Sequence, residues 1–149
     1  MTISFRFATK TDRQSAIQLW HDAGLTRPHN DPDLDFGFAV EAATSEILLA
    51  EQNGIIIGTC MVGHDGHRGA IYYLAVKPTH QGKGLGKQIM QQAEDYLVSQ
   101  GVWKINLFVR HGNENVLNFY DKQGYAPNAA VSLAKIIDKS KVPTLRDKN

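Results

Sequence analysis

The alternation of apolar and polar residues predicts a strand and then an amphipathic helix at the start of this chain. Residues 3–7 alternate as an edge strand does. Thr11 and Gln14 have the spacing of a capping box, so we expect a helix to begin there, and Gly24 is expected to end it. Between these points the apolar residues recur at helical spacing, at Ile17, Trp20 and Ala23.

The polar stretch that follows predicts a long loop. Residues 26–37 contain two prolines and few apolar side chains. The carboxylates of this stretch are expected to be solvated charges: Asp31, Asp33 and Asp35. A short helix is expected around residues 38–43.

Three strands joined by tight turns are predicted in the middle of the chain. They cover residues 47–51, 55–62 and 71–76. Asn53-Gly54 is typical of a type I′ turn, because both of its residues tolerate a positive φ. Residues 64–69 predict a second turn, so the three strands are expected to pair antiparallel.

The second half of the chain predicts alternating helices and strands. A helix is indicated by apolar residues at every fourth position: Leu85, Ile89, Ala93 and Leu97. We expect a strand over residues 103–109, then a helix between Asn113 and Gly124, and a last strand over residues 131–137. Residues 138–149 are expected to form a polar, frayed tail.

These elements predict an α/β (α+β mixed) fold. Its sheet is expected to be mixed and mostly antiparallel, with about six or seven strands flanked by helices. With 149 residues, 42% hydrophobic and 21% charged, the chain is expected to form one domain over residues 1–149.

Composition narrows the functional classes. A formal net charge of +1 without a basic run argues against nucleic-acid binding. No apolar stretch reaches the roughly 18 residues of a membrane helix, and no signal-peptide layout is present, so we expect a cytoplasmic protein that does not bind membranes. The six histidines have no zinc-binding spacing, so no metal is expected.

A glycine-rich turn between the third middle strand and the helix after it is the main candidate for chemistry. Gly82, Gly84 and Gly86 alternate there, and Lys83 and Lys87 add positive charge. Without Cβ atoms the backbone N–H groups and the positive end of the helix can approach phosphate oxygens. The turn therefore predicts a diphosphate-binding loop.

Two common nucleotide motifs do not fit this turn. A Walker A loop needs Ser or Thr after its Gly-Lys, and here Gln88 follows Gly86-Lys87. A dinucleotide fingerprint needs a different glycine spacing and an acidic residue at the end of the next strand, which here ends in Val109-Arg110. The remaining pattern is Gln81-x-x-Gly84-x-Gly86, a few residues after the strand end.

A second motif lies about thirty residues further along. Asn113 precedes a short helix that carries Tyr120, and Gly124 and Tyr125 follow. The two motifs in this order resemble those of the GCN5-related N-acetyltransferase (GNAT) superfamily. The resemblance extends from Ile3 to about Ile137. It is strongest to small stand-alone bacterial acetyltransferases of the YpeA type, to which the segments 27–32 and 65–69 contribute most.

The resemblance implies that acetyl-CoA is the cosubstrate. The backbone of one strand end would bind the pantetheine arm, and one of its N–H groups would polarise the thioester carbonyl: Leu74, Ala75 and Val76. The turn would hold the pyrophosphate: Gln81, Gly82, Lys83, Gly84, Leu85, Gly86 and Lys87. Asn113 would bind the cofactor arm or a catalytic water, and its alternative role is that of a helix cap.

Tyr120 matches the general acid of the family, because a phenol stays protonated at neutral pH and can donate to the CoA sulfur. Its alternative role is packing against the sheet. Several relatives have a glutamate as general base where this chain has Phe108, which cannot accept a proton. The base would then be one of four other residues, or none if the amine is already neutral: His111, Glu41, Asp65 or His67.

We therefore expect an N-acetyltransferase that transfers the acetyl group of acetyl-CoA directly to a primary amine in a ternary complex. The alternative is a catalytically weak acyl-CoA-binding module of the same fold. A ping-pong route through the lone cysteine, Cys60, is a further chemical alternative. The acceptor is a small amine or a peptide amine, and a homodimer stays open.

Overall fold

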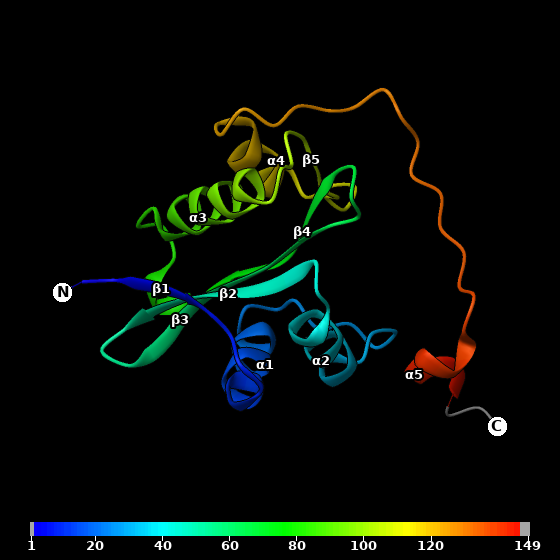
Figure 1. Cartoon of the computed structure of the whole chain (residues 1–149), viewed down its shortest axis with the longest axis horizontal. Helices are drawn as coiled ribbons and strands as arrows, with labels where there is room; N and C mark the ends of the chain where they lie inside the picture. The colour runs from blue at the N-terminus through cyan, green and yellow to red at the C-terminus, as the bar shows by residue number, and fades with distance from the viewer. Residues whose placement is uncertain (1, 147–149) are drawn as a thin grey trace.

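Five strands form one sheet in the order β1-β2-β3-β4-β5 in the computed structural model, which describes residues 2–146 (Figure 1). Their bounds are Ser4–Phe7 (β1), Ser45–Gln52 (β2), Ile55–His64 (β3), Gly69–Val76 (β4) and Ile105–Asn106 (β5). The first four pair antiparallel, and β5 pairs parallel to β4. The expected mixed, mostly antiparallel fold class is confirmed.

The turn between β2 and β3 follows the predicted type I′ pattern. Asn53 and Gly54 have φ values of 55° and 75°, and Gln52 pairs with Ile55. Local sequence alone sets this register, because both turn residues accept a left-handed conformation.

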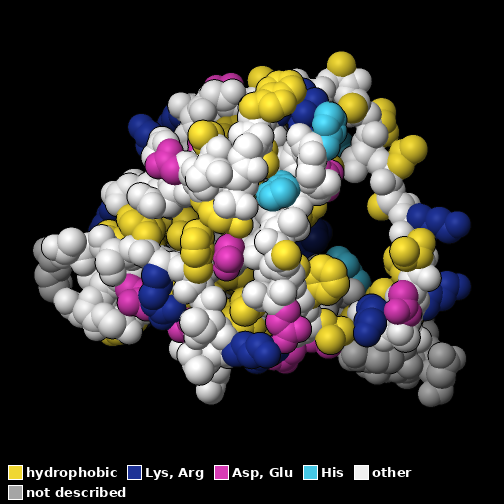
Figure 2. Space-filling model, in the orientation of Figure 1, with side chains coloured by type: hydrophobic (Ala, Val, Ile, Leu, Met, Phe, Trp, Pro, Cys, Tyr) yellow, Lys and Arg dark blue, Asp and Glu magenta, His cyan; other side chains and the backbone are white. Residues whose placement is uncertain are grey.

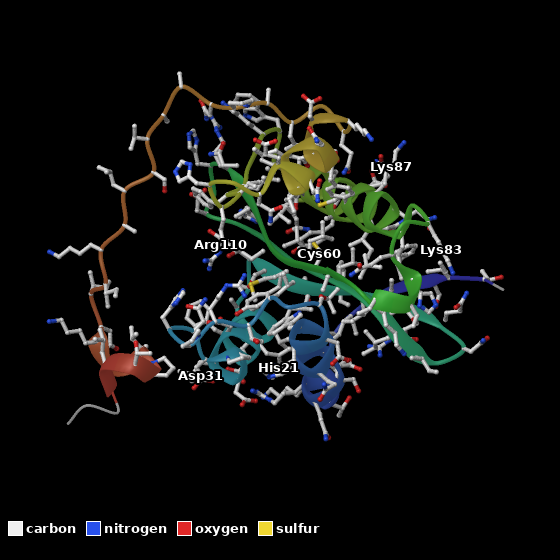
Figure 3. The ribbon with its side chains drawn as sticks, turned by 180° about the vertical axis from the view of Figure 1, so that it is seen from behind. His21, Asp31, Cys60, Lys83, Lys87 and Arg110 are labelled. Atoms are coloured by element: carbon white, nitrogen blue, oxygen red, sulfur yellow. The ribbon has the colours of Figure 1, made fainter. Side chains whose placement is uncertain are left out.

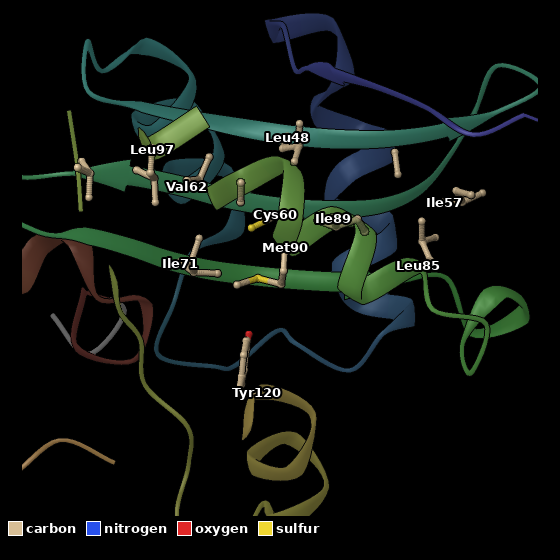
Figure 4. Packing of buried hydrophobic residues seen from close by; sticks show 13 residues of the cluster. Leu48, Ile57, Cys60, Val62, Ile71, Leu85, Ile89, Met90, Leu97 and Tyr120 are labelled. Carbon is tan, nitrogen blue, oxygen red and sulfur yellow. The ribbon is translucent and has the colours of Figure 1, made fainter. Parts of the chain in front are cut away.

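Helices cover both faces of the sheet. One face carries α1 (Arg13–Asp22) and α2 (Pro32–Glu41), which bury Trp20 and Phe36 against it. The other face carries α3 (Leu85–Ser99) and α4 (Glu114–Asp121) (Figure 1). The periodic apolar residues of α3 pack on β2, β3 and β4, and Tyr120 of α4 joins the same cluster (Figure 4).

The start of α1 differs from the expected capping box at Thr11 and Gln14. A short 3-10 helix, η1 (Lys10–Asp12), comes first, and the backbone N–H of Thr9 donates to Asp12 Oδ2 at 2.8 Å. Thr9 and Asp12 have the same three-residue spacing as Thr11 and Gln14. The capping box therefore forms two residues earlier than expected, at the start of η1. The expected end at Gly24 is confirmed, since its φ is 74°.

The expected loop over residues 26–37 is confirmed only up to Asp31, and the expected helix over residues 38–43 only for residues 38–41. α2 instead begins at Pro32, and Asp31 Oδ1 accepts the N–H groups of Asp33 and Leu34 at 3.0 and 3.4 Å. An aspartate before a proline is a helix N-cap followed by a first-turn proline, and the two residues together start the helix. Of the two prolines in this segment, Pro32 thus lies in the first turn of a helix and not in a loop.

The expected strand over residues 103–109 is reduced to β5. Trp103, expected on its apolar face, is 77% exposed, and the Arg68 guanidinium lies over its ring at 4.5 Å. The expected last strand over residues 131–137 does not form, so the sheet has five strands and not six or seven. In the described part of the tail, residues 138–146, two short helices occur, η3 (Lys139–Lys141) and α5 (Pro143–Arg146), while residues 147–149 lie outside the described residues.

Among residues 2–146, no helix has both the length and the apolar character that crossing a membrane requires.

Because α3 is held to the sheet by its apolar face, we expect Ile89→Ala to lower the free energy of unfolding by about 2–4 kcal/mol in urea titrations. Ile89 is fully buried. Gln92→Ala, on the exposed face of the same helix, is the matched control and should change stability by less than about 0.5 kcal/mol. Equal effects of the two substitutions would contradict this packing.

Candidate active site

The glycine-rich turn places the start of α3 directly after the end of β4. A 3-10 turn, η2 (Pro78–His80), follows β4, and Gln81 Nε2 donates to the Val76 carbonyl at 3.0 Å, which ties the turn to the strand end. Gly84 is the N-cap of α3 in the left-handed conformation, with φ 82°. The backbone at this point therefore needs glycine.

The N-terminus of α3 has no side-chain cap within the described residues. The first N–H groups of a helix have no partner inside the helix, and they carry its positive dipole end. A Cβ atom added at Gly82 or Gly84 would meet no atom within 4 Å, so both glycines border open space. Lys83 and Lys87 are exposed beside them (Figure 3).

Gly86 has a different constraint from the other two glycines of the turn. A Cβ atom there would lie 3.1 Å from Phe119 Cζ and 3.2 Å from Cε2. Gly86 thus lets α3 approach α4 closely. The sequence predicted an anion-binding role for all three glycines, and the backbone conformation fits that role at Gly82 and Gly84.

β4 and β5 diverge after a short parallel ladder. Their ladder consists of two pairs, Gly69 with Ile105 and Ala70 with Asn106. Beyond these pairs, among residues 2–146, the backbone groups of residues 107–109 have no backbone partner. The C-terminal half of β4 therefore has no β5 partner on the side that faces away from β3, and there the Val76 carbonyl accepts Gln81 Nε2.

A bulge in β4 lies where the two strands have separated. The register between β3 and β4 shifts between Thr59 and Met61, and Tyr73 has a φ of 49°. A positive φ is unfavourable for a bulky residue, and bulges change the direction of a strand. The residues after the bulge are Leu74, Ala75 and Val76, for which the sequence predicted cofactor contacts.

Hydrogen bonds from α2 and β3 and a stacked ring from α1 hold the bulged tyrosine. Its hydroxyl donates to Asp35 Oδ2 of α2 at 2.6 Å, and its carbonyl accepts the Thr59 hydroxyl at 3.0 Å. Thr59 Oγ1 in turn accepts the Trp20 indole N–H at 3.0 Å, and the Trp20 and Tyr73 rings stack with centroids 3.9 Å apart. Burial, together with the bond to Asp35, raises the pKa of Tyr73, so its phenol stays the donor.

No local sequence pattern predicts this network. Its hydrogen-bonded partners Tyr73 and Asp35 are 38 residues apart, and Trp20 and Thr59 are 39 residues apart. The expectation that these carboxylates are solvated charges is wrong for Asp31 and Asp35, whereas Asp33 is exposed. Asp31 caps α2, Asp35 binds Tyr73, and Asp33 lies 3.5 Å from the Arg13 guanidinium.

Tyr120 lies on the buried face of α4, with its hydroxyl directed toward the sheet (Figure 4). Its ring makes edge contacts with Phe119 and Tyr125, with centroids 5.0 and 5.4 Å apart. Burial, with a smaller contribution from Cys60, raises the pKa of Tyr120 to about 12. The phenol is therefore protonated at neutral pH.

Cys60 is fully buried in the middle of β3 (Figure 3). Burial raises the pKa of its thiol to about 12. Because the thiolate is the reactive form of cysteine, these surroundings disfavour Cys60 as a nucleophile. The geometry thus argues against the ping-pong alternative.

Asn113 is the N-cap of α4, and its Oδ1 accepts the backbone N–H of Val116 at 3.4 Å. The capping role left open from the sequence is therefore present in the structure. The same side chain is exposed and keeps its amide N–H group, so capping does not use up its hydrogen-bonding capacity.

Phe108, which stands where the resemblance implied a glutamate base, is 63% exposed, and its ring centroid lies 6.4 Å from that of Tyr72. Of the other candidates for a base, Glu41 forms an ion pair with Lys10 at 3.2 Å. Asp65 accepts the N–H groups of His67 and Arg68 in the turn between β3 and β4, which lowers its pKa and weakens it as a base. His67 and His111 are exposed.

Within the part of the chain that the structure describes, no three His, Cys, Asp or Glu side chains come together as a metal site. The region contains an uncapped helix N-terminus, a strand end without a β5 partner and a buried phenol.

Comparisons with known proteins agree with this geometry. The model of the acetyltransferase (GNAT) family matches residues 9–125. An acetyltransferase of Yersinia pestis (strain Pestoides F) is 35% identical over 139 residues, covering 92% of this chain and 99% of that protein. A protein of Yersinia pseudotuberculosis, also named an acetyltransferase, has the same identity and coverage.

Solved structures share the fold. The structure of AAC(6')-Iy with the bisubstrate analogue CoA-S-monomethyl-acetylneamine has a TM-score of 0.78 at 14% identity, covering 91% of this chain and 99% of that one. A ribosomal-protein-alanine N-acetyltransferase of Brucella melitensis biovar Abortus 2308 has a TM-score of 0.74 at 17% identity, with coverages of 91% and 100%.

The network around Tyr73 predicts that Tyr73→Phe lowers the free energy of unfolding by about 1.5–3 kcal/mol, because the Asp35 carboxylate loses a charge-assisted hydrogen bond. Urea unfolding at neutral pH measures this. Tyr72→Phe is the matched control: Tyr72 is the neighbouring, 49% exposed tyrosine, and its loss of a hydroxyl should cost less than about 0.5 kcal/mol. The network is refuted as a stabilising element if both variants unfold at the same urea concentration.

Proposed function

This chain belongs to the acetyltransferase (GNAT) family, and from that premise we propose that it transfers the acetyl group of acetyl-CoA directly to a primary amine in a ternary complex. One observation carries the proposal. The uncapped N-terminus of α3, the free edge of β4 beyond its bulge, and the buried hydroxyl of Tyr120 all belong to the region where β4 and β5 diverge.

The turn from Gln81 to Lys87 would hold the pyrophosphate of acetyl-CoA. Its open glycine positions and uncapped helix end fit a diphosphate, because oxygens can reach the N–H groups without meeting a Cβ atom. Lys83 and Lys87 would contribute charge. The pantetheine arm would lie along residues 74–76, whose backbone matches its amide groups as a neighbouring strand would.

Transfer requires three events at the thioester. The neutral amine nitrogen attacks the carbonyl carbon, the carbon–sulfur bond breaks, and the CoA thiolate takes a proton from Tyr120. A backbone N–H of residues 74–76 would stabilise the oxyanion as it forms. The proton lost by the amine passes to solvent, and Tyr120 regains a proton after the thiol leaves.

Burial raises the pKa of the Tyr120 phenol, and it would also raise the pKa of a CoA thiol bound beside it. A phenol with a pKa of about 12 would hold its proton against a thiolate in water, whose pKa is about 8.5. The Cys60 thiol, in the same cluster as Tyr120, has a pKa of about 12. A CoA sulfur desolvated to a similar degree would match the phenol.

Phe108 supports the second candidate, a catalytically weak acyl-CoA-binding module of the same fold. An exposed phenyl ring stands where several relatives have a carboxylate, and Glu41 and Asp65 already bind other groups. In the leading proposal the amine therefore loses its proton to water or to a histidine. Such an enzyme would accept neutral amines best.

The acceptor class is a small amine or a peptide amine. Among the structural neighbours, one is a ribosomal-protein-alanine N-acetyltransferase and another is an aminoglycoside acetyltransferase bound to sisomicin. The fold thus serves both kinds of acceptor. Screening amines with acetyl-CoA while measuring free CoA thiol tests the proposed activity, and thiol release with no amine would count against direct transfer.

We predict that CoA binds at the turn from Gln81 to Lys87 and stabilises the protein. CoA at about 100 times its dissociation constant should stabilise the protein by about 2.7 kcal/mol and raise Tm by about 5–10 °C, whereas ATP and NAD should not. Gly84→Leu should abolish the shift. Gly66→Leu is the matched control, since Gly66 also has a positive φ and open surroundings but lies in the turn between β3 and β4. Loss of the shift in both variants, or an equal shift with ATP, would refute this site.

Catalysis is predicted to depend on the hydroxyl of Tyr120. Tyr120→Phe should lower kcat about 10-fold or more with the amine found in the screen, and the CoA-induced shift in Tm should stay the same. Tyr96→Phe, on α3, should keep the wild-type kcat. An unchanged kcat for Tyr120→Phe, with acetyl transfer shown to be rate-limiting, would make Tyr120 a packing residue.

A further inference from the structure

Two aromatic side chains lie exposed where β4 and β5 begin to diverge. Tyr72 of β4 and Phe108, two residues after the end of β5, are 49% and 63% exposed, and their ring planes are inclined by 26° with centroids 6.4 Å apart. Among residues 2–146, neither ring is part of the apolar clusters that pack on the two faces of the sheet. Contiguous exposed apolar side chains are typical of binding surfaces. The two rings are called the aromatic platform below.

The bulge in β4 places Tyr72 on the face of the sheet that α1 and α2 cover. Tyr72 pairs with Met61, which packs in the same cluster as Trp20 of α1. Paired residues of neighbouring strands have their side chains on the same face. The next residue, Tyr73, stacks on Trp20, so two consecutive side chains of β4 point to one side of the sheet, as they do at a bulge.

Phe108 reaches the same face from the segment after β5. Leu107 and Val109, on either side of it, pack against the cluster under α3. Because side chains alternate along an extended segment, Phe108 points the other way and meets Tyr72. The platform therefore takes one ring from each of the two diverging segments, at the level of the bulge.

Two carboxylates act on the bulge beside the platform. The Tyr73 hydroxyl donates to Asp35 Oδ2 at 2.6 Å. Besides burial and this hydrogen bond, the charges of Asp35 and Asp31 raise the pKa of Tyr73. Negative charge and exposed aromatic surface thus lie next to one another on the face that carries α2.

The second helix adds further apolar surface around Asp35. Leu34 and Phe38 are 42% and 81% exposed, one position before Asp35 and three positions after it. Residues three apart are neighbours on a helix surface, so Phe38 lies on the side of α2 that carries Asp35. Over this helix, Figure 2 shows hydrophobic side chains next to acidic ones.

We propose that the acceptor is an arylalkylamine, a primary amine on a short chain that carries an aromatic ring, with the ring on Tyr72 and Phe108 and the ammonium group attracted by Asp35 and Asp31. This inference rests on the proposed function and names its substrate class. Residues 74–76, which would bind the thioester, directly follow the bulge, so an amine held at Tyr73 would lie beside the carbonyl that it attacks. As above, the ammonium group loses one proton to solvent before the neutral nitrogen attacks.

The spacing of the two rings determines how a ligand ring can bind. A ring inserted between them would need about 7 Å, twice the contact distance of two carbon atoms, and the centroids are 6.4 Å apart. The ligand ring would therefore lie across the platform, where it gains stacked or edge contacts. An acceptor that is polar along its whole length would lose water on these rings without regaining its hydrogen bonds.

Phe108 thereby acquires a role other than that of a lost base. A phenyl ring cannot accept the proton of the amine, but it can bind the carbon skeleton that carries the amine. In the catalytically weak module, replacing Phe108 would affect all amines alike. In an arylalkylamine acetyltransferase, the replacement should affect only amines that carry a ring.

Calorimetric titration in the presence of saturating CoA measures acceptor binding without turnover. 2-Phenylethylamine should bind about 10-fold or more tightly than ethylamine, which is the same amine without the ring. Phe108→Ala and Tyr72→Ala should each weaken the binding of 2-phenylethylamine by about 5- to 20-fold and change that of ethylamine by less than about 2-fold. Phe108→Tyr, which keeps the ring, should bind both amines as the wild type does.

Two further variants separate the ring contact from general effects. Trp103→Ala is the matched control, because Trp103 is a 77% exposed aromatic residue whose ring packs under the Arg68 guanidinium, and its removal should change neither affinity. Asp35→Asn can still accept the Tyr73 hydroxyl but has no charge, so it should weaken both amines by a similar factor, about 3-fold or more.

Failure of this inference and failure of the proposed function give different results. If amines are acetylated but kcat/KM is equal for 2-phenylethylamine and ethylamine, or if Phe108→Ala and Tyr72→Ala leave that ratio unchanged, the enzyme stands and the platform does not select the acceptor. If no amine is acetylated, the proposed function fails, and equal affinities in the calorimeter would overturn the platform as well. Loss of the CoA-induced Tm shift in both ring variants would assign the rings to the cofactor and overturn the inference.

Discussion

The divergence of β4 from β5 is the constraint on which the rest of this structure depends. Only two residue pairs join the strands, and a bulge at Tyr73 changes the course of β4 immediately afterward. A continuous ladder would have used the backbone groups of residues 74–76 within the sheet. Because the strands separate, β5 takes up none of these groups, although the Val76 carbonyl accepts Gln81 Nε2 and Ala75 pairs with Thr59 of β3. α3 begins just beyond them, with its N-terminus at the same end of the molecule.

A bulge with a positive φ needs support from its surroundings, and this fold provides it from the opposite face. The indole of Trp20, the hydroxyl of Thr59 and the carboxylate of Asp35 fix the ring and the carbonyl of Tyr73. α1 and α2 therefore do more than cover the sheet. They hold the strand conformation on which the proposed cofactor site depends, and they connect that site to the segment between the first two helices.

On the face of the sheet that α3 and α4 cover, burial determines which side chains stay protonated. Tyr120 and Cys60 share one apolar cluster, and there the pKa of each is raised to about 12. The same low polarity that keeps a thiol from acting as a nucleophile keeps a phenol protonated. Close packing of α3 and α4 maintains this environment, and Gly86 permits it by leaving room for the ring of Phe119.

The sequence by itself determined the local features of this protein. The helix faces, the Asn53-Gly54 hairpin, the glycine turn and the position of Tyr120 all follow from residues close together in the chain, because each depends on local backbone preference or on the period of apolar residues. The start of α2 was also encoded locally, by Asp31 and Pro32, and was missed because proline was interpreted only as a loop residue.

The tertiary structure alone decided what depends on contacts between distant residues. Tyr73 meets Asp35, and Gly86 meets Phe119, only after the sheet and its helices have assembled. The segment over residues 131–137 is a second case in which the local sequence does not decide the structure. Its composition favours a strand, but a strand is a paired structure, and whether a partner edge is present is a property of the folded molecule and its neighbours, not of the seven residues themselves.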